Sequence, residues 1–163
     1  MKLKSGETVV DRHNSHVHEG IGRFLPEALE KIESKGREFF VEEVDFGRPI
    51  GETICVTTGS QDTIVYAKRP GRRGCTRFVL NRTPDECPSL VVILKSIGGG
   101  EYVLISAFIG CRPEPEPWDQ RNFQQQANSA EAEKKSREFW ANHALIYGVE
   151  PIIPGTETEK CPW

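Results

Sequence analysis

The spacing of hydrophobic and polar positions along the chain predicts two helices on either side of a block of strands. Near the N-terminus, Leu25, Leu29 and Ile32 recur at intervals of four and three residues, as they do on one face of a helix. Pro26 is a favoured residue in a first helical turn, and Gly36 is typical of a helix end. We therefore expect the first helix to begin at Pro26 and to end at Gly36.

The middle of the chain contains short runs rich in Val, Ile, Phe and Thr, bounded by turn residues, which is typical of β-strands. The expected strands are residues 39–46, 53–58, 63–67, 76–80, 90–94 and 102–109. The last two are nearly continuous apolar runs, and the glycine-rich residues 96–100 join them. We expect these two runs to form an antiparallel hairpin of central strands that are covered on both faces.

A proline-rich segment and a second helix follow the strands. Residues 111–119 contain three prolines at alternate positions, which exclude a helix or a central strand and predict an extended crossing. The second helix is expected over residues 128–148, because Asn128 and Glu131 have the spacing of a capping box. His143 would lie on the apolar side of this helix and face the sheet.

These elements predict an α+β fold, an antiparallel β-sheet with an N-terminal helix and a long C-terminal helix packed on it. A length of 163 residues suits a single domain, 1–163. Its core is expected over about residues 10–110, with the crossing at 111–119 and the helix at 128–148 as an addition.

The composition also limits where the protein acts. No apolar run approaches the roughly 20 residues that cross a bilayer, and the N-terminus lacks the apolar segment of a secretory signal. The five cysteines are scattered, which argues against a disulfide framework and a zinc ribbon. We expect a cytoplasmic protein with reduced thiols and no membrane partner.

Basic residues are concentrated in the middle of a chain whose net charge is −3. The stretch between Asp62 and Asp85 has no acidic residue and contains Lys68, Arg69, Arg72, Arg73, Arg77 and Arg82. Such a basic stretch concentrates positive potential that holds phosphates, and the planar guanidinium group suits phosphate better than the ammonium group of Lys does. The alternative is a solvated loop whose charges face water.

Three of the four histidines lie together, at His13, His16 and His18. In an extended segment, His16 and His18 would share one face and could bind a metal, as His-x-His pairs do in cupins. The further residues of a cupin site are not evident, so two alternatives stay open. The segment is either a solvated stretch without a role or the source of a histidine for acid–base chemistry.

The fourth histidine, His143, stands three residues after Trp140 and four before Tyr147. At such a place a hydrogen-bonded core histidine is the more frequent outcome, and a catalytic or ligand-holding histidine is the alternative. Ser106 interrupts an apolar strand, so its hydroxyl either bonds a neighbouring backbone group or lies at a site.

Two arginines could hold a phosphate. Arg77 lies within an expected strand and would project to one face of the sheet, and Arg82 lies just beyond that strand. Lys95 ends the first strand of the hairpin.

The order of a histidine-bearing segment, a helix, a sheet with basic residues and a closing hairpin of residues 90–95 and 102–108 resembles the BECR superfamily. This superfamily of small metal-independent ribonucleases includes barnase, EndoU, RelE and colicins E5 and D, and many phage and bacterial toxin domains. The resemblance covers about residues 10–110. The proline-rich crossing and the helix containing His143 are additions to the common core, which leaves open whether His143 joins the site or only supports the sheet.

Carried onto this sequence, the resemblance implies a catalytic histidine near the start, basic residues on the middle strands and a hydroxyl near the last strand. The matching residues are His16 or His18, then Arg77, Arg82 or Lys95, and then Ser106. A neutral histidine would take the proton of a ribose 2′-hydroxyl, a second group would protonate the leaving 5′-oxygen, and arginines would hold the phosphate charge. No metal or other cofactor is implied.

The partners expected from this resemblance are RNA, for example tRNA, and a cognate inhibitor or antitoxin protein. Two other function classes stay open. The apolar hairpin and the proline-rich crossing could form a non-catalytic protein-interaction module, and His16 with His18 could form the metal site of an oxygenase or isomerase.

Overall fold

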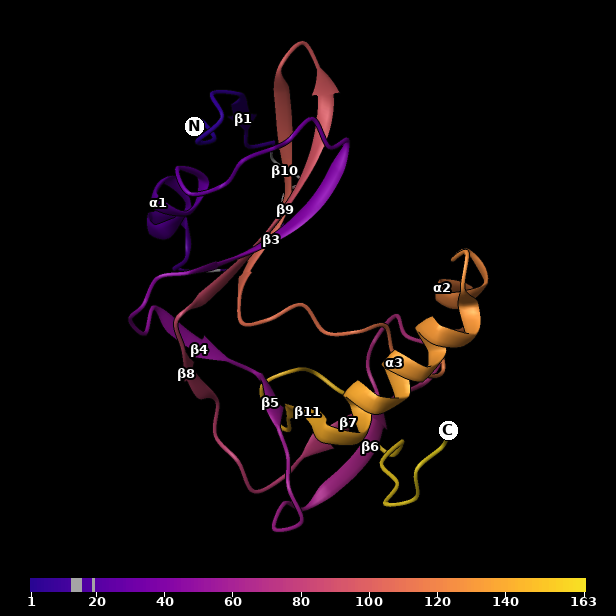
Figure 1. The fold of residues 1–163 in the computed structure, drawn as a ribbon. Helices are drawn as coiled ribbons and strands as arrows, with labels where there is room; N and C mark the ends of the chain where they lie inside the picture. Colours follow the sequence, from indigo (N-terminus) through magenta and orange to yellow (C-terminus); the bar gives the residue numbers. More distant parts are fainter. Residues whose placement is uncertain (13–15, 19) are drawn as a thin grey trace. The chain divides into compact units, whose positions relative to one another are not determined.

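The computed structural model of residues 1–163 describes the chain except for residues 13–15 and 19, so His13 lies outside the described residues. The chain divides into two compact units, each built from two separate segments. Unit 1 contains Met1–Glu52 and Glu86–Arg112, and unit 2 contains Thr53–Asp85 and Pro113–Trp163. Each unit has a sheet of its own, and Figure 1 traces the chain through both.

The sheet of unit 1 has the strand order β1-β10-β9-β3, and β2 also pairs with β10. Its strands are β1 (Thr8–Val10), β2 (His16–Val17), β3 (Phe39–Asp45), β9 (Ser89–Gly98) and β10 (Glu101–Ile109). β9 and β10 form the long antiparallel hairpin seen in Figure 1, and β3 runs antiparallel to β9. β1 and β2 run parallel to β10, so the sheet is mixed.

One face of this sheet is buried under the short 3-10 helix η1 (Gly22–Phe24) and helix α1 (Leu25–Leu29). Leu25, Ala28 and Leu29 pack there with Leu90, Val92 and Leu94 of β9. These three residues of β9 share one face because strand geometry sends successive side chains to opposite faces. This buried face is the core of unit 1.

The sheet of unit 2 has the strand order β5-β11-β7-β6. Its strands are β5 (Cys55–Thr57), β6 (Ile64–Lys68), β7 (Cys75–Val79) and β11 (His143–Ile146). β11 is antiparallel to β5 and parallel to β7, and it lies between them. A two-stranded sheet of β4 (Gly51–Thr53) and β8 (Asp85–Cys87) forms where the chain passes from one unit to the other.

The rest of unit 2 consists of helices α2 (Gln120–Gln124) and α3 (Ser129–Asn142) and a C-terminal segment. Trp140 of α3 is buried in one cluster with Phe78 of β7 and Leu145 of β11. The C-terminal segment runs along β6, where Thr158 and Tyr66 exchange two backbone hydrogen bonds of 2.8 Å. No helix among the described residues is both long enough and apolar enough to span a membrane.

The predicted fold class is wrong. The described chain is mostly β-structure in three sheets with short helices, and it is not an α+β fold with one antiparallel sheet and a long C-terminal helix packed on it. The first helix ends at Leu29 and not at Gly36. The reason is that the amide of Lys4 donates hydrogen bonds to the carbonyls of Leu29 and Ile32. A contact with the N-terminal segment therefore ends the helix.

The second helix begins where the sequence predicts it. Asn128 is its N-cap, and the Asn128 side chain accepts a hydrogen bond from the amide of Glu131. The helix ends at Asn142, however, and residues 143–146 form strand β11. His143 is therefore a strand residue, because Leu145 and Ile146 find register partners in Phe78 and Val79 of β7.

Candidate active site

The second face of the unit 1 sheet, opposite the buried core, carries several of the predicted site residues, and we call it the outer face. Along β9, Leu90, Val92 and Leu94 belong to the core, so Val91, Ile93 and Lys95 alternate onto the outer face. Lys95 is exposed and forms no ion pair with the described residues. It presents a positive charge at this face.

Ser106 of β10 also belongs to the outer face. Its neighbour Ala107 is buried in the core, and Ser106 itself is in register with Ile93. The pairing of β10 with β9 shifts by one residue between Leu104 and Ser106, which marks a β-bulge. Bulges of this kind re-aim side chains and are frequent beside active sites. Ser106 and Lys95 therefore share one face, and Lys95 lies two residues beyond the register partner of Ser106.

The histidine-bearing segment runs beside β10. In the parallel pair of β2 and β10, His16 and Ser106 are register partners. Just beyond β2, the amide of His18 donates a hydrogen bond of 3.2 Å to the carbonyl of Ala107. The exposed ring of His18 lies 6.0 Å from the ring of Phe108, measured between centroids. The sequence order predicted this proximity of an N-terminal histidine to a hydroxyl near the last strand only through the family resemblance.

Two phenylalanines that the sequence pattern did not mark as site residues also lie on the outer face. Phe39 is in register with Lys95 and is 52% exposed, while the next residue, Phe40, is buried in the core. Phe108 contacts His18. A signal for Phe39 was present, because two consecutive phenylalanines in a strand must point to opposite faces.

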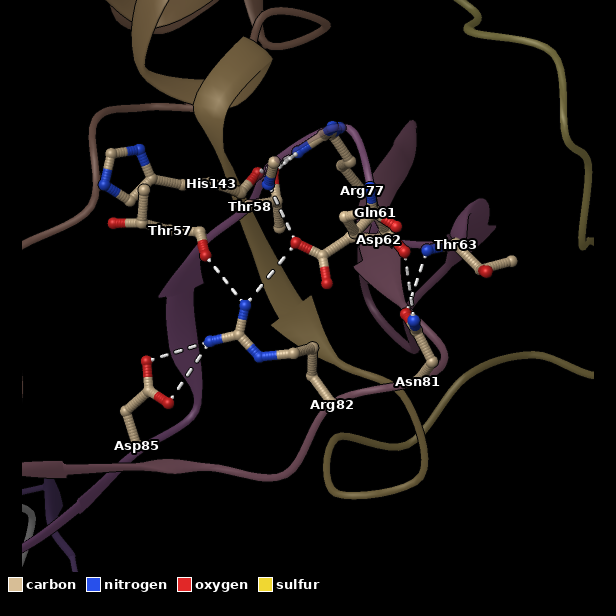
Figure 2. A network of polar contacts seen from close by, with 11 residues as sticks. Thr57, Thr58, Gln61, Asp62, Thr63, Arg77, Asn81, Arg82, Asp85 and His143 are labelled. Atoms are coloured by element: carbon tan, nitrogen blue, oxygen red, sulfur yellow. Dashed lines mark hydrogen bonds and ion pairs between the residues drawn. The ribbon is translucent and has the colours of Figure 1, made fainter.

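The remaining predicted site residues, Arg77, Arg82 and His143, lie in unit 2 (Figure 2). The Nη1 atom of Arg77 donates hydrogen bonds to the hydroxyl of Thr58, at 2.7 Å, and to the carbonyl of His143, at 3.0 Å. Arg77 also interacts with the hydroxyl of Tyr66, whose pKa is raised above its usual value. Burial is the main cause of that rise, the thiol of Cys161 adds to it and the guanidinium of Arg77 opposes it.

Arg82 joins three segments of unit 2. Its Nη1 atom contacts the carbonyl of Thr57 at 3.1 Å and the carboxylate of Asp62 at 3.4 Å. Its Nη2 atom contacts both carboxylate oxygens of Asp85, at 3.2 and 3.1 Å (Figure 2). The guanidinium donors of Arg77 and Arg82 are thus engaged in holding unit 2 together.

The imidazole of His143 contacts both the ring and the backbone carbonyl of Phe139. Its ring stacks on Phe139 with 3.9 Å between centroids and 3° between planes, and its Nδ1 atom lies 2.9 Å from the carbonyl of Phe139. Because a carbonyl only accepts, Nδ1 carries the proton and Nε2 has the lone pair in the neutral ring. Figure 2 shows the ring turned away from the guanidinium of Arg77, which reaches only the backbone carbonyl of His143.

The predicted site residues are therefore divided between the units. Unit 1 contains His16, His18, Lys95 and Ser106, and unit 2 contains Arg77, Arg82 and His143. Within unit 1 the four residues lie on neighbouring strands or beside them, so the outer face is the candidate site of unit 1. For the alternative metal site, no group of three or more His, Cys, Asp or Glu side chains suited to a metal ion occurs among the described residues.

The outer face can do three things chemically. His18 supplies an exposed imidazole, Lys95 supplies a positive charge, and the exposed ring of Phe39 supplies a flat apolar surface. In comparisons of the chain with protein-family models, with curated proteins and with solved structures, no match is found.

Proposed function

We propose that this protein is a metal-independent endoribonuclease whose site is the outer face of unit 1. The observation that supports this most directly is the parallel pairing of β2 with β10, which brings position 16 into register with Ser106. The same sheet face carries His18 and Lys95. Residues distant in the chain thereby share one surface.

In the proposed reaction, His16 or His18 takes the proton of a ribose 2′-hydroxyl, and the 2′-oxygen forms a bond to the adjacent phosphorus. The bond from phosphorus to the 5′-oxygen breaks, and the leaving oxygen takes a proton from a second group, a protonated histidine or a lysine. The products are a 2′,3′-cyclic phosphate and a 5′-hydroxyl end. Ser106 donates a hydrogen bond to the phosphate, and the ammonium group of Lys95 stabilises the negative charge of the transition state.

The aromatic residues of the outer face support RNA as the substrate. Proteins that recognise single-stranded RNA stack unpaired bases on aromatic side chains displayed by a sheet. Phe39 is exposed in register with Lys95, so a base stacked on Phe39 would have its phosphate within reach of the ammonium group. The reduced thiols of the five free cysteines fit action in the cytosol.

The test is cleavage of total RNA or tRNA by the purified protein in EDTA, with analysis of the RNA ends. We expect 2′,3′-cyclic phosphate ends, and we expect His18→Gln to lower the cleavage rate by about 10²–10⁴-fold if His18 is the acid or base. Intact RNA, or cleavage that EDTA abolishes, would contradict the proposal. A loss in His143→Gln with full activity in His18→Gln would move the site to unit 2.

A second candidate is a non-catalytic protein-interaction module. It is favoured by the large exposed apolar side chains of Phe39, Ile97 and Ile105 in the unit 1 sheet. Under this alternative, His18→Gln would leave the binding of a partner unchanged, whereas Phe39→Ser would weaken it.

A further inference from the structure

Unit 2 contains a cavity of about 200 Å³ on the same face of its sheet as Phe78 and Leu145. The loop between β6 and β7 forms one wall through Arg69 and Arg72, and the proline-rich crossing forms another through Trp118. Asn122 of α2 and Trp140 of α3 also line the cavity, as do the carboxylate residues Glu114, Glu116 and Asp119. All of these residues belong to unit 2, whereas the outer face belongs to unit 1.

Among the described residues, side chains of α2 and α3 donate three hydrogen bonds to carbonyls of the proline-rich wall. The hydroxyl of Ser136 donates to the carbonyl of Pro115 at 2.5 Å, and Nε1 of Trp140 donates to that of Glu114 at 2.9 Å. Nε2 of Gln120 donates to the carbonyl of Pro117 at 3.2 Å. Proline removes backbone donors but keeps the carbonyls, so helix side chains can fix the extended crossing from one side. The cavity therefore has a preformed wall.

A buried polar network fixes the opposite wall. The carboxylate of Glu116, 8% exposed, accepts hydrogen bonds from Nη2 of Arg69 at 3.0 Å and from the hydroxyl of Thr76. Nε of Arg69 donates to the same hydroxyl at 3.0 Å. The charge of Arg69 is thus compensated, and its guanidinium is held in one orientation. Arg69 therefore lines the cavity without offering it an uncompensated charge. A positive charge that binds a ligand would have to come from another residue.

That charge comes from the loop between β6 and β7. Lys68, Arg72 and Arg73 form no ion pair with the described residues, and all three are exposed. Arg72 also lines the cavity, so a planar guanidinium stands at its wall without a carboxylate partner. Of the carboxylates in the lining, Glu116 is paired with Arg69, Asp119 lies 3.7 Å from Nε of Arg121, and Glu114 is exposed. Arg72 is therefore the lining group that can hold a phosphate, because the fork of Arg suits phosphate oxygens.

The indole of Trp118 lies directly against the backbone of Gly74. A Cβ atom at position 74 would lie 2.1 Å from Cγ of Trp118, so the indole can occupy this place only because residue 74 is glycine. Nε1 of Trp118 is buried and has no hydrogen-bond partner among the described residues. A buried donor left unpaired is typical of a site that a ligand or a water molecule completes.

We propose that this cavity binds one nucleotide, with its phosphate at Arg72 and its base against Trp118. Indole rings bind flat aromatic bases, and the guanidinium binds the phosphate. Nδ2 of Asn122 donates a hydrogen bond of 2.9 Å to the carboxylate of Asp119, so its carbonyl oxygen and its second N–H are the groups that could meet a base edge. The nucleotide is taken to be part of the RNA substrate, and in this respect the inference rests on the proposed function. The cavity would then anchor RNA at a place separate in the chain from the cleavage residues.

The test uses the full chain, titrated in EDTA with AMP, GMP, CMP and UMP and, separately, with inorganic phosphate. We expect at least one nucleotide to bind and to quench the tryptophan fluorescence. Arg72→Ala should weaken its binding at least about tenfold, and Trp118→Phe should keep the affinity but reduce the quenching. Calorimetry measures the affinity independently of the fluorescence, and thermal unfolding shows that each variant is folded. The control is Lys135→Ala, an exposed cation on α3 away from the cavity lining.

The outcomes separate this inference from the proposed function. Nucleotide binding that depends on Arg72, without any RNA cleavage, supports the cavity and contradicts the ribonuclease. RNA cleavage in a protein whose nucleotide affinity is unchanged by Arg72→Ala overturns the cavity alone. Inorganic phosphate that binds as tightly as every nucleotide, or no binding at all, also overturns it.

Discussion

Arg69 and Glu116 are separated by 47 residues of sequence, yet Nη2 of Arg69 and the carboxylate of Glu116 lie 3.0 Å apart in unit 2. The pair joins the loop after β6 to the proline-rich crossing, and Thr76 hydrogen-bonds to both partners. Because Glu116 is buried and the side chain of Arg69 is only 19% exposed, this link is more than a solvated surface ion pair. It ties the two segments that form the walls of the cavity.

Glu116→Ala should therefore destabilise the protein. The substitution leaves the guanidinium of Arg69 and the hydroxyl of Thr76 without their acceptor, and removing one member of a buried pair costs about 3 kcal/mol. Denaturant unfolding measures the loss. Glu114→Ala, which removes an exposed carboxylate from the same segment, is the control. Equal stability of the two variants would show that the pair contributes nothing.

Gly74→Ala should disturb the cavity through Trp118. The added methyl group meets the indole, which must shift, and overpacking of this kind costs about 1–3 kcal/mol. The fluorescence of Trp118 and the nucleotide affinity should both change. Gly59→Ala is the control, because nothing lies within 4 Å of a Cβ atom at that position. Unchanged affinity in Gly74→Ala would mean that the indole does not contact the nucleotide.

Lys95→Ala should lower RNA cleavage about a hundredfold, since removing one group that stabilises transition-state charge commonly has an effect of this size. RNA binding should fall much less, because one charge among several is lost. Single-turnover cleavage separates the two effects. Lys135→Ala removes an equally exposed charge from unit 2 and should cleave at the wild-type rate. A full rate in Lys95→Ala would exclude Lys95 from the reaction.

The stability of unit 1 should depend on Glu7 at acid pH. Hydrogen bonds from the hydroxyls of Ser34, first, and of Ser5 lower the pKa of Glu7 below its usual value of 4.5. A carboxyl whose folded-state pKa is lowered contributes stability above its unfolded pKa, and this contribution is lost as the pH falls through the folded value. Ser34→Ala should raise the pKa of Glu7, the reverse of the shift in the wild type. An NMR titration of the Glu7 carboxyl measures it, and an unchanged pKa would contradict the assignment.

The affinity for RNA should fall as the salt concentration rises, and the loop between β6 and β7 should account for part of this fall. If Lys68, Arg72 and Arg73 neutralise three phosphates, affinity for single-stranded RNA should fall by about twentyfold between 50 and 200 mM salt from this contribution. The triple alanine variant should show a correspondingly shallower dependence. A double variant of Lys134 and Lys135, on the exposed side of α3, is the control. The same slope in the triple variant and the wild type would exclude the loop as an RNA contact.

Local patterns predicted most of the strands and the start of the second helix. The hairpin of β9 and β10 is confirmed, because two apolar runs joined by glycines need only their own turn to pair. The Asn128 cap is confirmed for the same reason, since the cap and Glu131 are three residues apart. The end of that helix was not predictable in this way, because His143–Ile146 pairs with strands that lie at least 64 residues earlier in the chain.

The candidate site, like the fold, was predictable only in part. The family resemblance predicted that a histidine of the N-terminal segment and Ser106 belong to one site, and in the structure His16 and Ser106 are register partners in β2 and β10. The resemblance also placed Arg77 and Arg82 at that site and left open whether His143 joins it, whereas these three residues lie in unit 2 with their own partners. The cavity residues Trp118 and Glu116 carried no signal beyond the proline pattern around them.

By itself, the sequence determined which short segments are extended, where the glycine-rich turn lies and where the positive charge is concentrated, since these depend on residues close together in the chain. Only the tertiary structure decided that the chain forms two units with interleaved segments, that His143 is in a strand and that Glu116 meets Arg69. The physical reason is that strand pairing and buried ion pairs join residues far apart in the chain, and their stability depends on what else the fold brings to the same place.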